Sequence, residues 1–196
     1  MMRVMADTHL VRPAAEHLAR YVAALERCWS PDNLRGAAAA AEELRQIAND
    51  PAAFLARFDD EQAAAGPVPM PDGTTRPRLP SIRRWIWADD FCGSIGLRWT
   101  SDGGPLPEHV PGHLGYAVVP WRQREGHATQ ALRLMLSEAR ARGLCRVEIT
   151  TDPGNVASRK VVLANGGRLL GPYERPAALG GGQGLKFVID LGGSAP

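Results

Sequence analysis

Val118-Val119-Pro120-Trp121-Arg122-Gln123-Arg124-Glu125-Gly126-His127-Ala128 is the stretch that decides the fold. An apolar run ends at a proline, a short polar loop follows, and a helical pattern begins near Ala128. The first N–H groups of a helix have no partners within the helix, and the helix dipole adds partial positive charge, so this arrangement binds anions. Gly126 and Ala128 are small enough to let a ligand approach those N–H groups. The segment therefore predicts a phosphate-binding loop between a strand and a helix.

The loop differs from two other phosphate-binding loops that sequence motifs identify. It lacks the GxxxxGK[ST] pattern of a P-loop, and no GxGxxG opens a helix after an early strand. Nucleoside triphosphates and dinucleotides are therefore disfavoured as ligands.

Regular patterns extend on both sides of this loop. We expect a strand over 113–119 before it, and after it a helix that carries an apolar stripe to Ala139 and ends near Gly143. The chain then alternates as a strand over 145–151, and Asn155 caps a second helix that runs to about Ala164. Strands near 168–173 and 185–191 follow, separated by a flexible turn over 180–184.

The N-terminal part has a different pattern. Residues 13–60 predict two or three short helices, and the proline-rich stretch 63–80 predicts an irregular loop. Short aromatic and β-branched runs at 83–87 and 93–99 predict a hairpin, in which Trp85 and Trp87 lie on one face that packs on the core. The length of 196 residues and the 44% hydrophobic content fit one globular domain.

Two motifs resemble those of a known family. Gln123-x-x-Gly126-x-Ala128, after a strand that ends Val-Val-Pro, resembles the Q/R-x-x-G-x-G/A motif of the GNAT family of N-acetyltransferases, which cradles the pyrophosphate of acetyl-CoA. Asn155-Val156-Ala157-Ser158 is similar to the second motif of the family, Asn-x-x-Ser/Ala. The resemblance is carried by residues 112–167 and extends over 83–191, and the order of strands and helices matches as well.

The resemblance implies an α/β (α+β) fold with a mixed, mostly antiparallel sheet whose two central strands splay apart, flanked by helices. It implies a single domain over 1–196, with about 1–80 on the acceptor side and about 81–191 as the acetyl-CoA-binding core. Acetyl-CoA is then the cosubstrate, with pantetheine in the wedge between the strands and Val119 near the backbone donor for the oxyanion. The cofactor-binding residues implied are Val118, Val119, Gln123, Arg124, Gly126, His127, Ala128, Thr129, Asn155 and Ser158, and Arg122 either steers the phosphates or is a solvated surface residue.

The reaction implied is direct transfer of the acetyl group to an amine, which needs a base for the amine and a proton for the thiolate leaving group. Many family members carry a tyrosine for the second task at the position of Val162. Here Tyr116 or Tyr173 can supply the proton, or the thiolate leaves unassisted. For the base, His113 is the first candidate, because an imidazole titrates near neutral pH, and Glu148 is the second.

Two function hypotheses follow. The first is an acetyl-CoA-dependent N-acetyltransferase acting on an amine of a small molecule or peptide, and the second is a catalytically silent CoA-binding module, which Val162 favours a little. A nucleic-acid partner is disfavoured because the formal net charge is only +2. The three cysteines form no CxxC pair and no apolar run approaches membrane length, so we expect a cytoplasmic protein with no metal and no membrane contact. A homodimer is compatible with the sequence.

Overall fold

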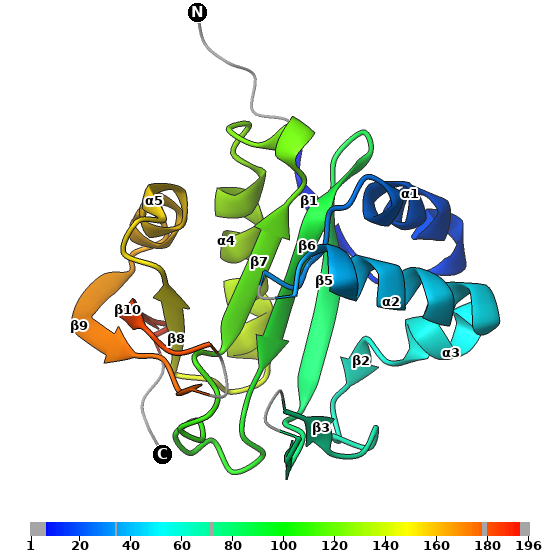
Figure 1. Ribbon diagram of the computed structural model, residues 1–196. Coiled ribbons are helices and arrows are strands. Elements are labelled where there is room, and N and C mark those ends of the chain that lie inside the picture. Colours follow the sequence, from blue (N-terminus) through cyan, green and yellow to red (C-terminus); the bar gives the residue numbers. More distant parts are fainter. Residues whose placement is uncertain (1–6, 34, 71–72, 178–179, 193–196) are drawn as a thin grey trace, which may run out of the picture.

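The larger of two main sheets is built around three consecutive strands. The computed structural model describes residues 7–33, 35–70, 73–177 and 180–192 (Figure 1). Its central strands are β5 (Ser81–Trp87), β6 (Phe91–Arg98) and β7 (Leu114–Val118), and β1 (His9–Val11) and β2 (Asp59–Asp60) both pair with β5. All of these pairings are antiparallel.

The second sheet has three strands and comes from the last third of the chain. Its order is β8 (Arg146–Thr151), β10 (Gln183–Asp190) and β9 (Arg168–Glu174), again antiparallel. A two-residue ladder joins β3 (Val68–Pro69) to β4 (Thr75–Arg76). The predicted α/β (α+β) fold with mostly antiparallel pairing and splayed central strands is confirmed.

Helices cover the sheets from both sides. The N-terminal helices α1 (Ala15–Glu26), α2 (Ala37–Asn49) and α3 (Pro51–Ala56) lie beside β5, while α4 (His127–Ala141) lies behind β7 and α5 (Val156–Ala164) lies near β8 (Figure 1). A short 3-10 turn, η1 (Pro120–Arg122), connects β7 to the loop before α4. The two or three short N-terminal helices predicted from the sequence are thus present.

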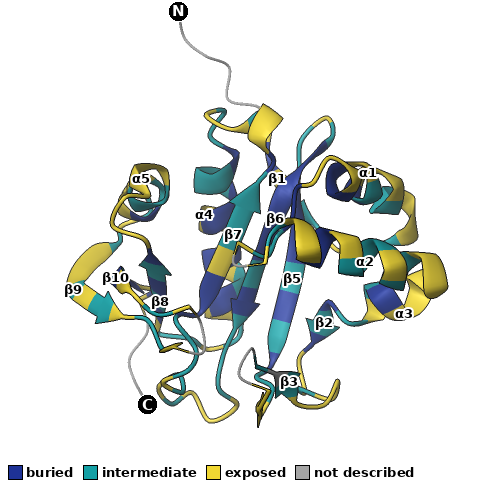
Figure 2. Ribbon diagram, viewed as in Figure 1, coloured by how far each residue is buried: buried dark blue, intermediate teal, exposed yellow. Residues whose placement is uncertain are grey.

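Two apolar clusters hold these layers together. The first packs the predicted stripe of α4 against both sheets, and the second packs α1 to α3 against the opposite face of β5 and β6. In the second cluster the ring of Tyr21 stacks on that of Trp85, with 4.6 Å between centroids. Trp85 is fully buried and Trp87 packs at the margin, which confirms that the alternating tryptophans lie on one face against the core. The strands β5 and β6 are mostly buried (Figure 2).

Local sequence explains where several elements begin and end. Gly143 has φ +79° just after α4, a left-handed conformation that glycine adopts without a steric penalty. The side chain of Asp50 accepts a hydrogen bond from the N–H of Ala53 at 2.9 Å and so caps α3. The predicted turn over 180–184 is wrong at its end, because Gln183 pairs with Glu174 and belongs to β10.

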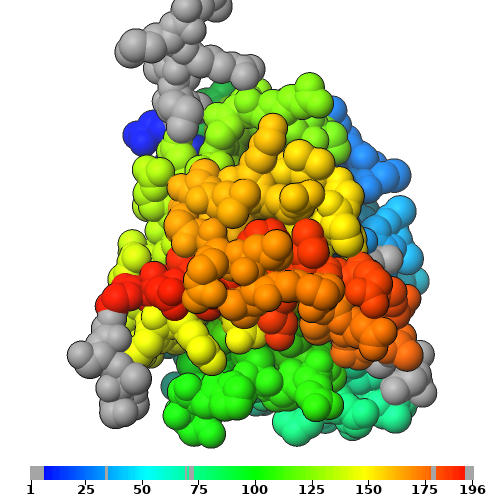
Figure 3. Space-filling model, turned by 90° about the vertical axis from the view of Figure 1, so that its left-hand side faces the viewer, coloured from blue at the N-terminus to red at the C-terminus, as the bar shows by residue number. Residues whose placement is uncertain are grey.

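The side of the molecule in Figure 3 is formed largely by α5, β9 and β10. Four large apolar side chains of α5 and β9 are exposed, namely Val156, Leu163, Leu169 and Leu170. The homodimer suggested by the sequence stays a prediction. Within the described ranges, none of the helices has the length and apolar character needed to cross a bilayer.

Candidate functional site

The two sheets meet at one end of β7 and separate along the rest of it. The N–H of His113 donates to the carbonyl oxygen of Glu148 at 2.8 Å. In return, Nδ1 of the His113 ring accepts a hydrogen bond from the N–H of Glu148 at 3.0 Å. Beyond this point β7 pairs only with β6, and β8 pairs only with β10. The result is a wedge between β7 and β8 that is closed at His113.

Gly112 allows this close approach at the narrow end of the wedge. A Cβ atom at Gly112 would lie 2.8 Å from the carbonyl oxygen of Glu148 and 3.3 Å from Cα of Ile149. Both are backbone atoms of the neighbouring strand, which cannot turn away as a flexible side chain would. The two sheets therefore touch here only because residue 112 has no side chain.

The inner edge of β7 offers backbone groups to the wedge. The N–H of Val119 donates to the carbonyl oxygen of Cys92 in β6 at 2.9 Å. In an antiparallel pair, successive residues point their backbone groups alternately toward and away from the partner strand. With Val118 opposite Gly93 in the register, the backbone groups of Val118 and Tyr116 point away from β6 and into the wedge. Of the pair Val118 and Val119, the backbone group available to a ligand is that of Val118.

The loop between β7 and α4 curls tightly at the open end of the wedge. Arg124 has φ +65° and Gly126, the residue before the first helical turn, has φ +90°. In the part of the chain that the structure describes, no side chain caps the N-terminus of α4. The N–H groups of Ala128 and Thr129 in the first turn therefore keep their capacity to bind an anion, as the sequence predicts for this loop.

His127 anchors this loop from beneath. Its side chain is buried, with 1% of the residue exposed. Nδ1 lies 2.9 Å from Oγ1 of Thr8, and Nε2 lies 3.1 Å from Oε2 of Glu125. Because a carboxylate only accepts, we assign the proton to Nε2, and the Thr8 hydroxyl then donates to Nδ1. Both ring nitrogens are therefore satisfied in the neutral form.

Arg122 extends the same network to the turn between β5 and β6. Its Nε donates to Glu125 at 3.0 Å and its Nη2 donates to Asp89 at 2.6 Å. The hydrogen bond from Arg122 lowers the pKa of Asp89, and the one from His127, with Arg122 adding to it, lowers the pKa of Glu125. Arg122, an alternative phosphate ligand in the sequence analysis, thus has two carboxylates as partners.

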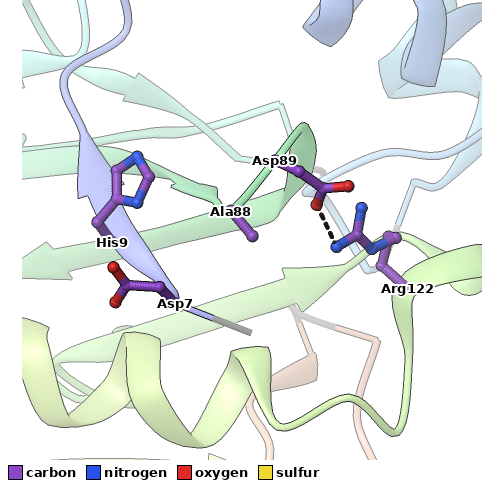
Figure 4. Close-up of a pocket in the computed structure, with 5 residues that line it drawn as sticks. All are labelled: Asp7, His9, Ala88, Asp89 and Arg122. Atoms are coloured by element: carbon purple, nitrogen blue, oxygen red, sulfur yellow. Dashed lines mark hydrogen bonds and ion pairs between the residues drawn. The ribbon is translucent and has the colours of Figure 1, made fainter. Parts of the chain in front are cut away.

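A concave surface lies beside this network. It is lined by Asp7 and His9 on one side and by Ala88, Asp89 and Arg122 on the other (Figure 4). A second concave surface lies between β1 and α4. Both flank β1 and neither reaches the wedge, so we place the candidate site at the wedge on the grounds of backbone geometry.

Across the wedge from β7 stands the start of α5. Oδ1 of Asn155 accepts a hydrogen bond from the N–H of Ser158 at 3.0 Å, which confirms Asn155 as the predicted helix cap. Oγ of Ser158 lies 2.9 Å from the hydroxyl of Tyr116. Burial raises the pKa of Tyr116, so its hydroxyl stays protonated at neutral pH. Tyr116 and Ser158 thus bridge β7 and α5.

Asn165 is a residue at this site that the sequence analysis does not single out. Its Nδ2 donates to the carbonyl oxygen of Thr129 at 3.1 Å and to that of Val161 at 2.9 Å. The bond to Thr129 joins the end of α5 to the first turn of α4. It therefore fixes the distance between the loop motif before α4 and the Asn155 motif at the start of α5. In the sequence, an asparagine before two glycines indicates only that a helix ends there. Its hydrogen-bond partner Thr129 lies 36 residues away, so no local pattern reveals the contact.

His113 and Glu148, the two candidate bases, differ in environment. Burial lowers the pKa of His113 to about 4, an effect that Arg98 strengthens and Glu148 opposes. Glu148 pairs with Lys186 at 3.2 Å, and its side chain is 22% exposed. The hydroxyl of Tyr173, the second candidate acid, is buried and has no hydrogen-bond partner within the described residues.

The described residues contain no cluster of metal ligands. Among them, no three His, Cys, Asp or Glu side chains gather in a way that would hold a metal ion.

Comparisons with known proteins point to one family. The family model described as "Acetyltransferase (GNAT) domain" matches residues 33–168. A search of curated protein sequences finds no match.

Three solved structures of similar fold are distant from this chain in sequence. Mycobacterium smegmatis RimJ in complex with CoA-disulfide has a TM-score of 0.61 at 19% identity, covering 93% of this chain and 81% of that one. The Salmonella typhimurium acetyltransferase that modifies the N-terminal serine of ribosomal protein L7/L12 has a TM-score of 0.59 at 14% identity, covering 93% and 94%. The microcin C7 self-immunity acetyltransferase MccE, in complex with acetyl-CoA and AMP, has a TM-score of 0.58 at 13% identity, covering 93% and 92%.

Proposed function

Because the chain belongs to the acetyltransferase (GNAT) domain family, we propose that it transfers an acetyl group from acetyl-CoA to an amine of a small molecule or peptide. The family assigned from the two sequence motifs is thereby confirmed. The observation that carries the proposal is the wedge between β7 and β8, where one edge of β7 pairs with no described strand and the N-terminus of α4 has no described side-chain cap at the open end. Proteins of similar fold hold acetyl-CoA or CoA, which supports the choice of cosubstrate.

The residues at the wedge fit acetyl-CoA in two respects. The edge of β7 at Tyr116 and Val118 can pair with the amide groups of pantetheine, as a neighbouring strand would. The small residues Gly126 and Ala128 let a pyrophosphate reach the N–H groups of α4, and the His127 anchor holds the loop in that shape. We propose as cofactor-binding residues Val118, Val119, Gln123, Arg124, Gly126, His127, Ala128, Thr129, Asn155 and Ser158, as the family motifs imply. Acetyl-CoA supplies the acetyl thioester.

We propose Tyr116 as the proton donor to the leaving thiolate. Many family members carry a tyrosine at the position of Val162, and here that valine is fully buried. Ser158 lies one helical turn before Val162, on the same face of α5, and it contacts the Tyr116 hydroxyl. The phenol of Tyr116 thus comes close to where the family's tyrosine stands, but it reaches the site from β7 instead of from α5.

His113 suits a structural role better than the role of base. Its Nδ1 already accepts a hydrogen bond from the backbone, and a pKa of about 4 leaves little driving force for taking a proton from an ammonium ion. Glu148 is the better candidate to accept the amine proton, directly or through water, because its carboxylate is partly exposed on β8. We therefore propose that His113 positions Glu148.

A silent CoA-binding module is the second candidate function. The buried Val162 favours it, because no proton donor occupies the family's usual position. Both candidates bind the cosubstrate alike, so only turnover separates them.

The first experiment titrates acetyl-CoA into the protein by calorimetry. We expect Gly126→Glu to weaken binding by about 100-fold, because its carboxylate repels the pyrophosphate and blocks the N–H groups of α4. Gly143→Glu is the matched control, since it makes the same change at a glycine with positive φ at the other end of α4. Equal affinity in all three proteins would refute the proposed phosphate site.

The second experiment measures release of the CoA thiol with a panel of small amines and short peptides. Turnover with any amine supports the enzyme, and Tyr116→Phe is expected to lower kcat by at least about tenfold while the affinity for acetyl-CoA changes little. Tight binding of acetyl-CoA with no turnover across the panel favours the silent module instead.

A further inference from the structure

β6 and β7 present a nearly bare face on the side away from α4. The side chains of Ile95, Leu97 and Leu114 are buried in the cluster that contains α4. Because successive side chains of a strand alternate between faces, those of Ser94, Gly96, Gly115 and Ala117 face the other side. The register places Ser94 opposite Ala117 and Gly96 opposite Gly115. Between Ser94 and Gly96 on β6 and between Gly115 and Ala117 on β7, this face therefore carries only small residues.

The space above the two glycines is largely free. Among the described residues, chain neighbours aside, a Cβ atom at Gly96 would have within 4 Å the carbonyl oxygen of Ile82 alone, at 3.6 Å. On the same terms, a Cβ atom at Gly115 would have Nη2 of Arg98 alone, at 3.8 Å. On the same face, helices α1 to α3 pack against Trp85 of β5. Over Gly115 the nearest side-chain group is instead the guanidinium group of Arg98.

Arg98 is the unusual residue of this face. It is half-buried, and within the described residues no carboxylate or other acceptor lies within hydrogen-bonding distance of its guanidinium group. Burial lowers its pKa, and the nearby charge of Arg83 lowers it further. A half-buried guanidinium group without a counter-charge attracts an anion more strongly than a fully hydrated one does.

Arg83 adds a second cation to the same face. It is the direct partner of Gly96 in the neighbouring strand β5. Among the described residues its carboxylate partner is Glu43, 4.0 Å away, and Glu43 also accepts a closer hydrogen bond from Arg57 at 2.8 Å. Glu43 is thus shared by two guanidinium groups, and Arg98 adds a third with no described carboxylate partner, so the described groups leave an excess of positive charge around the bare glycines.

The positive charge of Arg98 and Arg83 lies next to the wedge. Gly115 immediately precedes Tyr116, whose backbone faces the wedge and whose hydroxyl contacts α5. The backbone N–H of Arg98 donates to the carbonyl oxygen of His113 at 2.9 Å, at the narrow end of the wedge. If one end of a molecule lies on Gly96 and Gly115, its other end can therefore reach the edge of the wedge.

We infer that Arg98 and Arg83 bind an anionic group of the acetyl acceptor, with Gly96 and Gly115 as the floor beneath it. The inference rests on the proposed function and assigns the substrate class: an amine that also carries a carboxylate or a phosphate. A planar guanidinium pairs with either group through two parallel hydrogen bonds, and it does so most strongly where water is excluded.

The main experiment compares acceptors in matched pairs by release of the CoA thiol. One pair is an amino acid and its amide, and the other is a phosphorylated amino alcohol and the free amino alcohol, so the two pairs separate carboxylate from phosphate. We expect the anionic member of at least one pair to have a kcat/KM at least about tenfold higher. Arg98→Gln should remove that preference by raising KM for the anionic member alone, whereas the exposed Arg168→Gln should leave it intact.

Two outcomes of this experiment would overturn the inference. One is a preference for the neutral member of both pairs. The other is an equal loss of activity of Arg98→Gln on both members of a pair, with acetyl-CoA affinity retained, which would indicate a general structural role for Arg98.

A binding measurement tests the anion site even if no amine is turned over. In the Gly126→Glu background, where the phosphate site at α4 is blocked, inorganic phosphate is titrated against a chloride control of equal ionic strength by thermal shift. We expect phosphate to raise the melting temperature of this protein and to lose that effect when Arg98→Gln is added. An equal effect in both proteins would overturn the inference, while absence of turnover alone would count only against the proposed function.

Discussion

The two ends of the wedge differ in how β7 and β8 relate: the strands touch at one end and separate at the other. At the narrow end, His113 and Glu148 exchange two hydrogen bonds and Gly112 lets the strands touch. At the open end, no other strand pairs with the inward edge of β7 at Val118, whose carbonyl oxygen accepts a hydrogen bond from Nε2 of Gln123 at 3.4 Å, and the loop before α4 curls outward. The site thus exists because β7 and β8 stop pairing beyond His113. Specific contacts close one end of the wedge, and the other end stays open to a ligand.

The largest expected effect tests the closed end through Gly112→Val. The new side chain would meet backbone atoms of Glu148 and Ile149, so the strands must separate. We expect a loss of about 3 kcal/mol in the free energy of unfolding, measured by urea denaturation. Gly115→Ala is the control, because its Cβ would meet only the flexible side chain of Arg98. Similar stabilities of the two variants would show that the narrow end is not tightly closed.

The second prediction uses pH to open the same end. The pKa of His113 is about 4 in the folded protein and about 6.5 in an unfolded chain, so the unfolded chain binds the extra proton first as pH falls. The stability contributed by neutral His113 is therefore complete above pH ~6.5 and is lost progressively toward pH ~4.

Between pH 7 and pH 5 this loss amounts to about 2 kcal/mol. The measurement is urea denaturation at both pH values for the wild type and for His113→Asn, whose amide oxygen does not titrate in this range. If both proteins lose the same stability, the bond from Glu148 to the imidazole does not control the narrow end.

The third prediction tests the anchor of the open end through Thr8→Val. This change keeps the shape of the side chain but leaves Nδ1 of the buried His127 without the hydroxyl. We expect a loss of about 1.5 kcal/mol in unfolding free energy and a weaker affinity for acetyl-CoA by calorimetry, because the loop is then less well held. Thr8→Ser restores the hydroxyl and should recover both values. Unchanged affinity in Thr8→Val would separate the anchor from the ligand site.

The smallest expected effect concerns the far wall of the open end. Asn155→Ala removes the cap of α5 and should lower the unfolding free energy by about 1 kcal/mol. Asn155→Asp keeps an acceptor oxygen and is the control. If the two variants differ in acetyl-CoA affinity but not in stability, Asn155 acts on the ligand more than on the helix.

Local patterns in the sequence predicted most of the fold around the wedge. The apolar stripe of α4, the alternation of β8 and the cap at Asn155 each depend on residues within one or two turns of the chain, and all three are present. The splay of the central strands came from the family resemblance, because no local pattern states where pairing between two strands stops.

The rest of the site depends on partners far apart in sequence. Thr8 and His127 are 119 residues apart, and nothing near either residue indicates the other. The absence of a described partner for Arg98 is likewise invisible in the sequence, where an arginine in a strand is usually a solvated residue. For His113, the sequence shows the imidazole at the start of the strand, but only the structure shows that its Nδ1 is already bonded.

The division of strands between the two sheets has a consequence for how the chain folds. Every strand of the first sheet precedes α4, and every strand of the second follows it. Contacts within each sheet therefore join residues of one segment, and those local contacts form faster than contacts between segments. During synthesis all described strands of the first sheet leave the ribosome before β10 does. The wedge needs both sheets, so we expect the ligand site to be among the last parts of the molecule to take shape.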